Sequence, residues 1–173
     1  MKALVLGGVR SGKSRYAAEL AGEHDCPVTL IVTGRALDDE MAARIAAHRA
    51  SRPAHWIVVE EPMRLATALA AAAGPNRMVI VDCLTLWLTN LLCSDDRDAL
   101  PRESGRVLEA LPALPGHCVL VANEVGLGII PVNALARRFT DETGVLHQRL
   151  AAICDRVVLM VAGLPLIVKA DPQ

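Results

Sequence analysis

Short apolar runs alternate with amphipathic stretches along the chain. Most of the runs are apolar at nearly every position, which is typical of strands covered on both faces. They predict strands at residues 3–6, 28–33, 56–60, 78–82, 118–123 and 156–161, with an antiparallel hairpin partner at 166–169. The amphipathic stretches predict helices at residues 13–23, 38–50, 63–73, 84–93 and 133–153.

Strands that alternate with helices in this way indicate a mostly parallel sheet flanked by helices. Residues 94–114 combine charges with Gly105 and, counting Pro115, three prolines, so we expect a loop-rich insertion around a short helix there. The 173 residues suit a single domain, 1–173, because a second core would have too little chain.

Composition and charge argue against nucleic acid as a partner and against a membrane span. The 18 Lys and Arg residues nearly balance the 19 Asp and Glu residues, and the chain has two Trp, one Tyr and one Phe. Proteins that bind nucleic acid usually carry a basic excess, and single-strand binders also need aromatic side chains for stacking, so we expect no nucleic acid as partner. The longest uncharged apolar stretch, 157–168, is much shorter than the ~20 residues of a membrane span, so no transmembrane segment is expected.

The first residues and the cysteines both indicate a cytoplasmic protein. The apolar run at 3–6 meets glycines at once, which does not fit a signal peptide. The five cysteines are odd in number, scattered, and without a CxxC pair. We interpret them as buried free thiols rather than as disulfides or zinc ligands.

A glycine-rich segment directly follows the first predicted strand. It fits the pattern G-x-x-x-x-G-K-[ST] at every fixed position and consists of Gly7, Gly8, Val9, Arg10, Ser11, Gly12, Lys13 and Ser14. Such a P-loop turns backbone N–H groups toward a phosphate, and the dipole of the following helix adds to the attraction. Lys13 would reach the β- and γ-phosphates, and the Ser14 hydroxyl would ligate Mg²⁺. The alternative is a strand-to-helix turn without a ligand.

A second magnesium ligand is expected where a neighbouring strand ends. Asp82 follows four apolar residues and fits that position. It could instead cap the next helix, and the two roles are compatible. Together the two motifs predict a purine nucleoside triphosphate and Mg²⁺, but they do not identify the group that accepts the phosphate.

The predicted helix 38–50 carries a basic face. Arg44, His48 and Arg52 follow one another at spacings of four and share this face if the helix continues to Arg52. The stripe could neutralise a triphosphate or pyrophosphate, although a solvated basic face is the simpler interpretation of the spacing alone.

A polar turn, 123–131, follows the fifth predicted strand. It contains Glu124, Gly126 and Gly128 at the strand end where open α/β sheets bind their ligands. An ordinary strand-to-helix turn would explain the same residues equally well.

Taken in this order, the segments resemble the bifunctional adenosylcobinamide kinase / adenosylcobinamide-phosphate guanylyltransferase family of cobalamin biosynthesis over nearly the whole chain. The matching residues are 7–15; 38–41 with Arg44, Ile45 and His48; Arg52 and Pro53 with Trp56 and Glu60; 82–85 with 89–92; and 123–126 with Gly128, Ile129 and Pro131. Residues 94–114 and the C-terminal tail match least. The resemblance implies a P-loop NTPase of RecA-like architecture.

The resemblance also implies two reactions. In the first, a hydroxyl of adenosylcobinamide takes the γ-phosphate of ATP or GTP. In the second, His48 attacks the α-phosphate of GTP, pyrophosphate leaves, and the bound GMP passes to adenosylcobinamide phosphate to give adenosylcobinamide-GDP. The resemblance therefore favours a nucleophilic His48 over the solvated basic face that spacing alone suggests. Neutral imidazole is a competent nucleophile near pH 7.

Further nucleotide contacts and an assembly are implied by the same resemblance. Besides the P-loop, the contacts are Val32, Thr33, Gly34, Arg49, Ala50, Ser51, Arg52, Glu60 and Asp82. We add the hypothesis that the Glu60 carboxylate accepts guanine N1–H and N2–H₂ and so selects guanine. The assembly is a homotrimer that binds the corrinoid between subunits.

Two other functions fit the motifs without the resemblance. A P-loop kinase of another small alcohol would transfer the γ-phosphate without forming covalent GMP, and its His48 would be structural. A RecA-like nucleotide-dependent switch would couple slow hydrolysis to a partner, but it gives no role to the grouping of Arg44, His48 and Arg52.

Overall fold

The computed structural model describes residues 1–35, 39, 43 and 53–170. Its centre is a seven-stranded sheet in the order β3-β2-β4-β5-β1-β6-β7. The parallel strands are β1 (Lys2–Gly7), β2 (Val28–Val32), β3 (Ile57–Glu60), β4 (Met78–Asp82), β5 (His117–Asn123) and β6 (Arg156–Val161). β7 (Leu164–Lys169) runs antiparallel to β6, which confirms the predicted hairpin.

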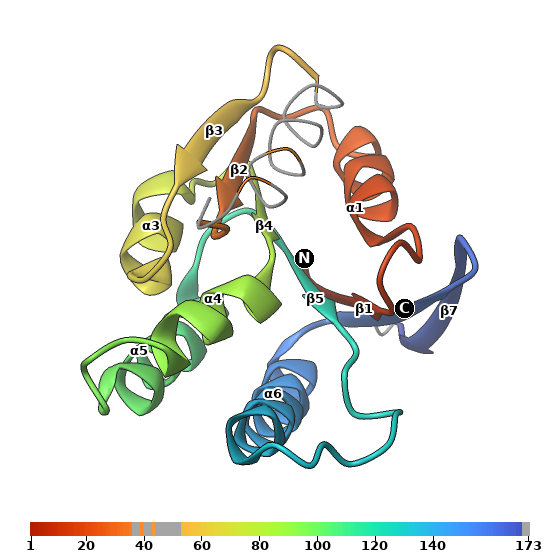
Figure 1. Cartoon of the computed structure of the whole chain (residues 1–173). Coiled ribbons are helices and arrows are strands. Elements are labelled where there is room, and N and C mark those ends of the chain that lie inside the picture. The colour runs from red at the N-terminus through yellow and green to blue at the C-terminus, as the bar shows by residue number, and fades with distance from the viewer. Residues whose placement is uncertain (36–38, 40–42, 44–52, 171–173) are drawn as a thin grey trace.

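Helices cover both faces of this sheet (Figure 1). α1 (Lys13–Gly22) packs on one face, against β1, β4 and β5. The helices that pack on the other face are α3 (Leu65–Ala72), α4 (Leu84–Leu92), α5 (Ala99–Ala110) and α6 (Ala134–Ile153). The predicted mostly parallel architecture is therefore confirmed. The predicted helix 38–50 lies outside the described residues apart from Asp39 and Ala43.

The core consists of two layers that share the central strands. Along β5, Leu120 belongs to the layer under α3 to α6, whereas Val119 and Val121 belong to the layer under α1. Successive side chains of a strand point to opposite faces, so a strand covered on both sides must be apolar throughout. The edge strands depart from this pattern, since β3 exposes Ile57 and most of β7 is exposed.

Residues 94–114 are more helical than their composition predicted. α5 has 12 residues and continues into a 3₁₀ turn at Leu111–Ala113. Pro101 is tolerated because it stands in the first turn of α5, where a backbone N–H has no partner within the helix. Leu100, Val107 and Leu108 recur at helical spacing and are buried, so the hydrophobic face outweighs the breakers.

All five cysteines are free thiols, as predicted. Their burial was predicted wrongly in part, because Cys93 is exposed and Cys26 is half-buried. Burial raises the pKa of Cys118 and that of Cys154 to about 12, which keeps both as inert thiols. Among the helices described, none is long and apolar enough to span a bilayer.

Candidate functional site

The P-loop connects β1 to α1 in a conformation that needs glycine. Gly12 adopts a positive φ of 98°, and Arg10 also lies in the left-handed region. A Cβ on Gly7 would stand 2.6 Å from the Met160 carbonyl oxygen, so no larger residue fits there without movement. The turn therefore has the geometry that its sequence pattern predicts.

Lys13 lies within this loop rather than in solvent. Its side chain is buried, and Nζ donates a hydrogen bond to the Gly8 carbonyl at 2.6 Å. Burial lowers the pKa of Lys13, and the nearby Cys83 and Asp82 oppose that shift. An anion bound in the loop would compensate the cost of desolvating the ammonium group.

Two buried polar side-chain atoms of the described residues lack a hydrogen-bond partner. Within the described part of the chain, the buried side-chain atoms without a hydrogen bond are Oγ of Ser11, in the P-loop, and Nε2 of His147, on α6. Buried polar groups are almost always paired, so an orphaned hydroxyl in a phosphate-type loop fits a site that is completed by a ligand.

The side chains of the two predicted magnesium ligands contact each other at the carboxyl edge of the sheet. Ser14, at the start of α1, donates through Oγ to Oδ2 of Asp82 at 3.0 Å. Asp82 ends β4, as the sequence predicted. A hydroxyl and a carboxylate are hard oxygen donors, and Mg²⁺ usually takes only one or two protein ligands beside waters and phosphates. The pair therefore fits this cation chemically.

A buried network holds the end of β4 in place. The Thr33 hydroxyl donates to the Cys83 carbonyl at 2.6 Å and accepts from the Cys83 N–H at 3.1 Å. Asn90 on α4 donates to the carbonyls of Thr33 and Pro62. These bonds occupy the polar groups of Thr33 and fix the backbone that follows Asp82, whose peptide bond to Cys83 is cis. The nucleotide contact expected at residues 32–34 stays a prediction.

Glu60 lies at the same edge as Asp82 but on the outermost strand. The register pairs Glu60 with Val32 and Val32 with Asp82, which places the two carboxyl-bearing residues about 10 Å apart across two strand spacings. Its proposed contact with guanine stays a prediction. The predicted nucleophile His48 and the residues 49–52 lie outside the described residues, so their roles also stay predictions.

The β6–β7 hairpin forms a brace on the P-loop that no sequence pattern predicted. The tip of the β6–β7 hairpin reaches the loop, where the Gly163 N–H donates to the Ser11 carbonyl at 3.0 Å. Arg15 of α1 donates through Nη2 to the Gly163 carbonyl at 3.0 Å. The signal in the sequence was the Ala162–Gly163 turn between two apolar runs, but its partner is some 150 residues away.

The turn after β5 is also tied to the P-loop. Glu124 donates through its backbone N–H to the Gly7 carbonyl at 3.0 Å, and its Oε2 lies 4.0 Å from Nδ1 of the buried His147. A small hollow of about 180 Å³ opens beside this turn and is lined by Val125, Gly126, Gly128, Ile129, Ile130, Pro131, Arg137, Thr140 and Asp141.

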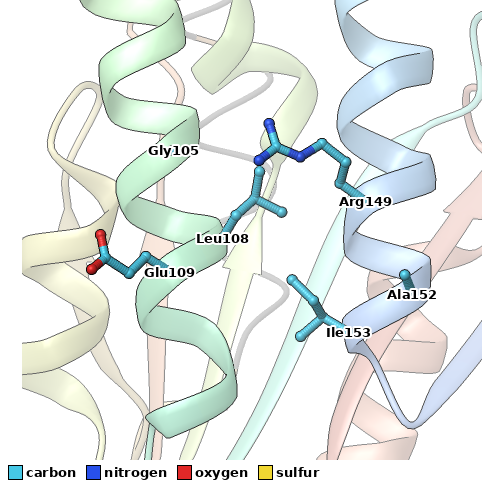
Figure 2. A pocket seen from close by; sticks show the side chains of 6 residues that line it. All are labelled: Gly105, Leu108, Glu109, Arg149, Ala152 and Ile153. Atoms are coloured by element: carbon cyan, nitrogen blue, oxygen red, sulfur yellow. The ribbon is translucent and has the colours of Figure 1, made fainter.

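A larger, shallow groove of about 420 Å³ lies between α5 and α6 (Figure 2). Figure 2 shows the Arg149 guanidinium close to Leu108, with Ile153 below it and Glu109 turned away. No P-loop residue lines this groove. The candidate site residues Lys13, Ser14 and Asp82 lie instead at the carboxyl edge of the sheet.

Comparisons with known proteins found relatives that match the chain over nearly its whole length. A bifunctional adenosylcobalamin biosynthesis protein of Pseudomonas aeruginosa, CobP, is 53% identical over 172 residues, which cover 99% of both chains. The Escherichia coli protein of the same description, CobU, is 42% identical over 98% of this chain and 100% of its own. These relatives span essentially the whole chain.

A solved structure supports the fold alone. A prototypical ATPase from the type III secretion system of pathogenic bacteria matches 91% of this chain and 50% of its own, with a TM-score of 0.54 and 13% identity. The predicted P-loop NTPase fold of RecA-like architecture is thus confirmed. Residues 3–168 match the family described as cobinamide kinase / cobinamide phosphate guanyltransferase, and the chain belongs to that family.

Proposed function

We propose that the chain catalyses both reactions of its family on adenosylcobinamide. It first transfers the γ-phosphate of ATP or GTP to a hydroxyl of this corrinoid, and it then transfers GMP from GTP to the phosphorylated product. The observation that carries the proposal is the meeting of Lys13, Ser14 and Asp82 at one edge of the sheet. Family membership favours this function over a kinase of another alcohol or a nucleotide switch.

The first reaction needs the triphosphate held and its charge neutralised. The backbone N–H groups of the P-loop bind the phosphates, and the Lys13 ammonium moves from the Gly8 carbonyl to a phosphate oxygen. Ser14 and Asp82 would hold Mg²⁺, which would supply positive charge to neutralise the triphosphate.

The second reaction uses His48 as nucleophile. The imidazole attacks the α-phosphate of GTP, pyrophosphate leaves, and a covalent GMP intermediate divides one displacement into two easier ones. Arg44, Arg49 and Arg52 lower the fraction of His48 that is protonated and balance charge on the leaving pyrophosphate. Glu60 selects guanine through its carboxylate.

Trapping of the covalent intermediate tests the second reaction. The protein is incubated with α-labelled GTP and Mg²⁺ and then denatured; we expect acid-labile, alkali-stable label on the chain. His48→Ala abolishes the label, whereas His55→Ala, which changes an exposed histidine nearby, retains it. Label that survives His48→Ala would contradict the nucleophile assignment, and no label in the wild type would contradict the guanylyltransferase.

Transfer from γ-labelled ATP or GTP to adenosylcobinamide tests the first reaction. We expect Lys13→Ala to lose this transfer by a factor of about 10² or more, because the buried ammonium is removed from the phosphate site. The matched control is Arg77→Ala, which changes an exposed cation on the far edge of the sheet, before β4. Near wild-type turnover of Lys13→Ala would contradict the role of the P-loop.

We further propose that the protein works in the cytoplasm as a homotrimer of single-domain chains, 1–173. Exposed apolar side chains support self-association, because large apolar patches on a surface usually mark interfaces. They lie on the turn after β5 and on β7 and are Leu127, Ile129, Ile130, Val132, Leu164, Leu166 and Val168. Light scattering coupled to size-exclusion chromatography should give three times the 18.4 kDa mass of one chain.

A further inference from the structure

The proposed kinase reaction, on which this inference rests, needs a group that takes the proton of the attacking hydroxyl. Positioned carboxylates serve as such acceptors in phosphoryl transfer. Among the described residues, the carboxylates that end a parallel strand or directly follow one at the P-loop edge are Glu60, Glu61, Asp82 and Glu124.

Three of these carboxylates are unsuited to accepting the proton, because of their hydrogen bonds or their position in the sheet. Asp82 accepts a hydrogen bond from Ser14 as a proposed metal ligand. Glu61 accepts from the backbone N–H groups of Met63 and Arg64, just before α3. Glu60 ends β3, which is four strands away from β1 in the sheet. Glu124 differs because it follows β5, the strand that pairs directly with β1.

Glu124 is fixed against the P-loop by its backbone. Asn123 is in register with Gly7, and the Glu124 N–H donates to the Gly7 carbonyl at 3.0 Å. Its Oε1 accepts from the Gly126 N–H at 2.6 Å, which folds the side chain over the turn. No described residue donates a hydrogen bond to Oε2. The Glu124 side chain is 22% exposed, so its carboxylate is not sealed off from a bound substrate.

His147 supports the same carboxylate from α6. It is 7% exposed, its Nδ1 lies 4.0 Å from Oε2 of Glu124, and its Nε2 is buried without a partner among the described residues. Burial lowers the pKa of His147, and the nearby Glu124 carboxylate opposes that shift. A neutral imidazole can carry its proton on Nδ1 and donate it to Oε2 after a small rotation.

We propose that Glu124 accepts the proton of the substrate hydroxyl and that His147 is a positioning residue for the Glu124 carboxylate. The hydroxyl oxygen of the corrinoid arm forms a bond to the γ-phosphorus. The bond from the γ-phosphorus to the β–γ bridging oxygen breaks, and ADP or GDP leaves with that electron pair. The hydroxyl proton passes to Oε2 of Glu124 and then to water.

Glu124→Gln tests the proton acceptor. The glutamine keeps an oxygen for the Gly126 N–H but cannot take up a proton. We expect kcat for phosphorylation of adenosylcobinamide to fall by a factor of about 10² to 10⁴. Nucleotide affinity, circular dichroism and covalent labelling by α-labelled GTP should stay at wild-type levels. Glu109→Gln, which changes an exposed carboxylate beside the groove in Figure 2, should retain wild-type kcat.

His147→Leu and His147→Asn test the positioning role. The leucine variant removes the donor beside Oε2, so we expect kcat to fall about tenfold, with KM unchanged. Asparagine keeps an N–H near the place of Nδ1 and should restore most of the lost kcat.

The outcomes separate this inference from the proposed function. A kcat of Glu124→Gln within threefold of wild type, or a loss of nucleotide affinity in that variant, would overturn the role of Glu124 alone. A kcat that His147→Leu leaves unchanged, or a fall in kcat that His147→Asn does not restore, would overturn the positioning role. Wild-type protein that does not phosphorylate adenosylcobinamide would refute the kinase itself, and this inference with it.

Discussion

At the scale of single residues, Asp82 links the P-loop to the end of β4. Its carboxylate accepts from Ser14 at 3.0 Å, and its charge acts on the buried Lys13. Thr33 and Asn90 fix the chain just beyond it. A substitution at this position therefore removes the proposed metal ligand and a counter-charge of Lys13 while leaving the supporting network intact.

Asp82→Asn should separate chemistry from folding. We expect phosphorylation of adenosylcobinamide to fall by about 10² or more, and the Mg²⁺ concentration for half-maximal rate to rise, because a neutral amide binds the cation weakly. A Mg²⁺ titration of turnover measures both effects. Asp95→Asn, an exposed change after α4, is the matched control and should behave as wild type. An unchanged Mg²⁺ dependence in Asp82→Asn would contradict the ligand role.

At the scale of elements, the β6–β7 hairpin restrains the P-loop. Gly163 at its tip has a φ of 84° and bonds to both Ser11 and Arg15. A Cβ there would lie 3.1 Å from Nη2 of Arg15, and a Cβ on Gly12 would lie 3.3 Å from the Gly163 Cα. The hairpin and the loop can approach this closely because both positions are glycine.

Gly163→Ala should loosen that restraint. The left-handed conformation costs an alanine about 1 kcal/mol, and the new methyl group displaces Arg15. We expect lower nucleotide affinity, measured by calorimetry, together with a melting temperature lower by a few degrees. Gly105→Ala is the opposite control, since it stands within α5 with open space around it and should stabilise the protein. Unchanged affinity in Gly163→Ala would show that the hairpin does not act on the loop.

What could be predicted from the sequence depended on how local the determining contacts are. The P-loop and Asp82 were predicted because strand, turn and helix signals stand within about ten residues of each. The hairpin brace joins Ser11 to Gly163, and Glu124 meets His147 only after α6 folds back. Contacts between such distant residues leave no periodic pattern in the sequence. α5 was underestimated because its breakers are local, whereas the packing of Val107 and Leu108 is tertiary.

At the scale of the whole molecule, the two edges of the sheet carry different ionisable groups. The P-loop and Asp82 stand at the carboxyl edge, whereas β1 and β5 begin at the other edge beside a cluster of basic groups. There the rings of His24 and His117 stack with centroids 4.0 Å apart, and the Met1 amino group donates to Nδ1 of His117 at 3.3 Å. Protonation of His117 would break that hydrogen bond and place like charges together.

This cluster should make folding stability depend on pH. Partial burial lowers the pKa of His117, and His24, the Met1 amino group and Lys2 lower it further. Below the usual value of about 6.5 the unfolded chain binds a proton that the folded chain does not, so stability is lost as pH falls. Solvent screening keeps the contribution of this half-buried group well below the limit of about 1.4 kcal/mol per pH unit.

His117→Gln should therefore flatten the dependence of stability on pH. We expect urea denaturation at pH 7.5 and pH 5.5 to give a smaller difference in the free energy of unfolding for the variant than for the wild type. Part of the difference should persist, because burial also lowers the pKa of His147, which acts with the same sign. His55→Gln, which alters an exposed histidine outside the cluster, should keep the wild-type difference. Equal differences in the wild type and His117→Gln would show that the stacked pair does not couple protonation to folding.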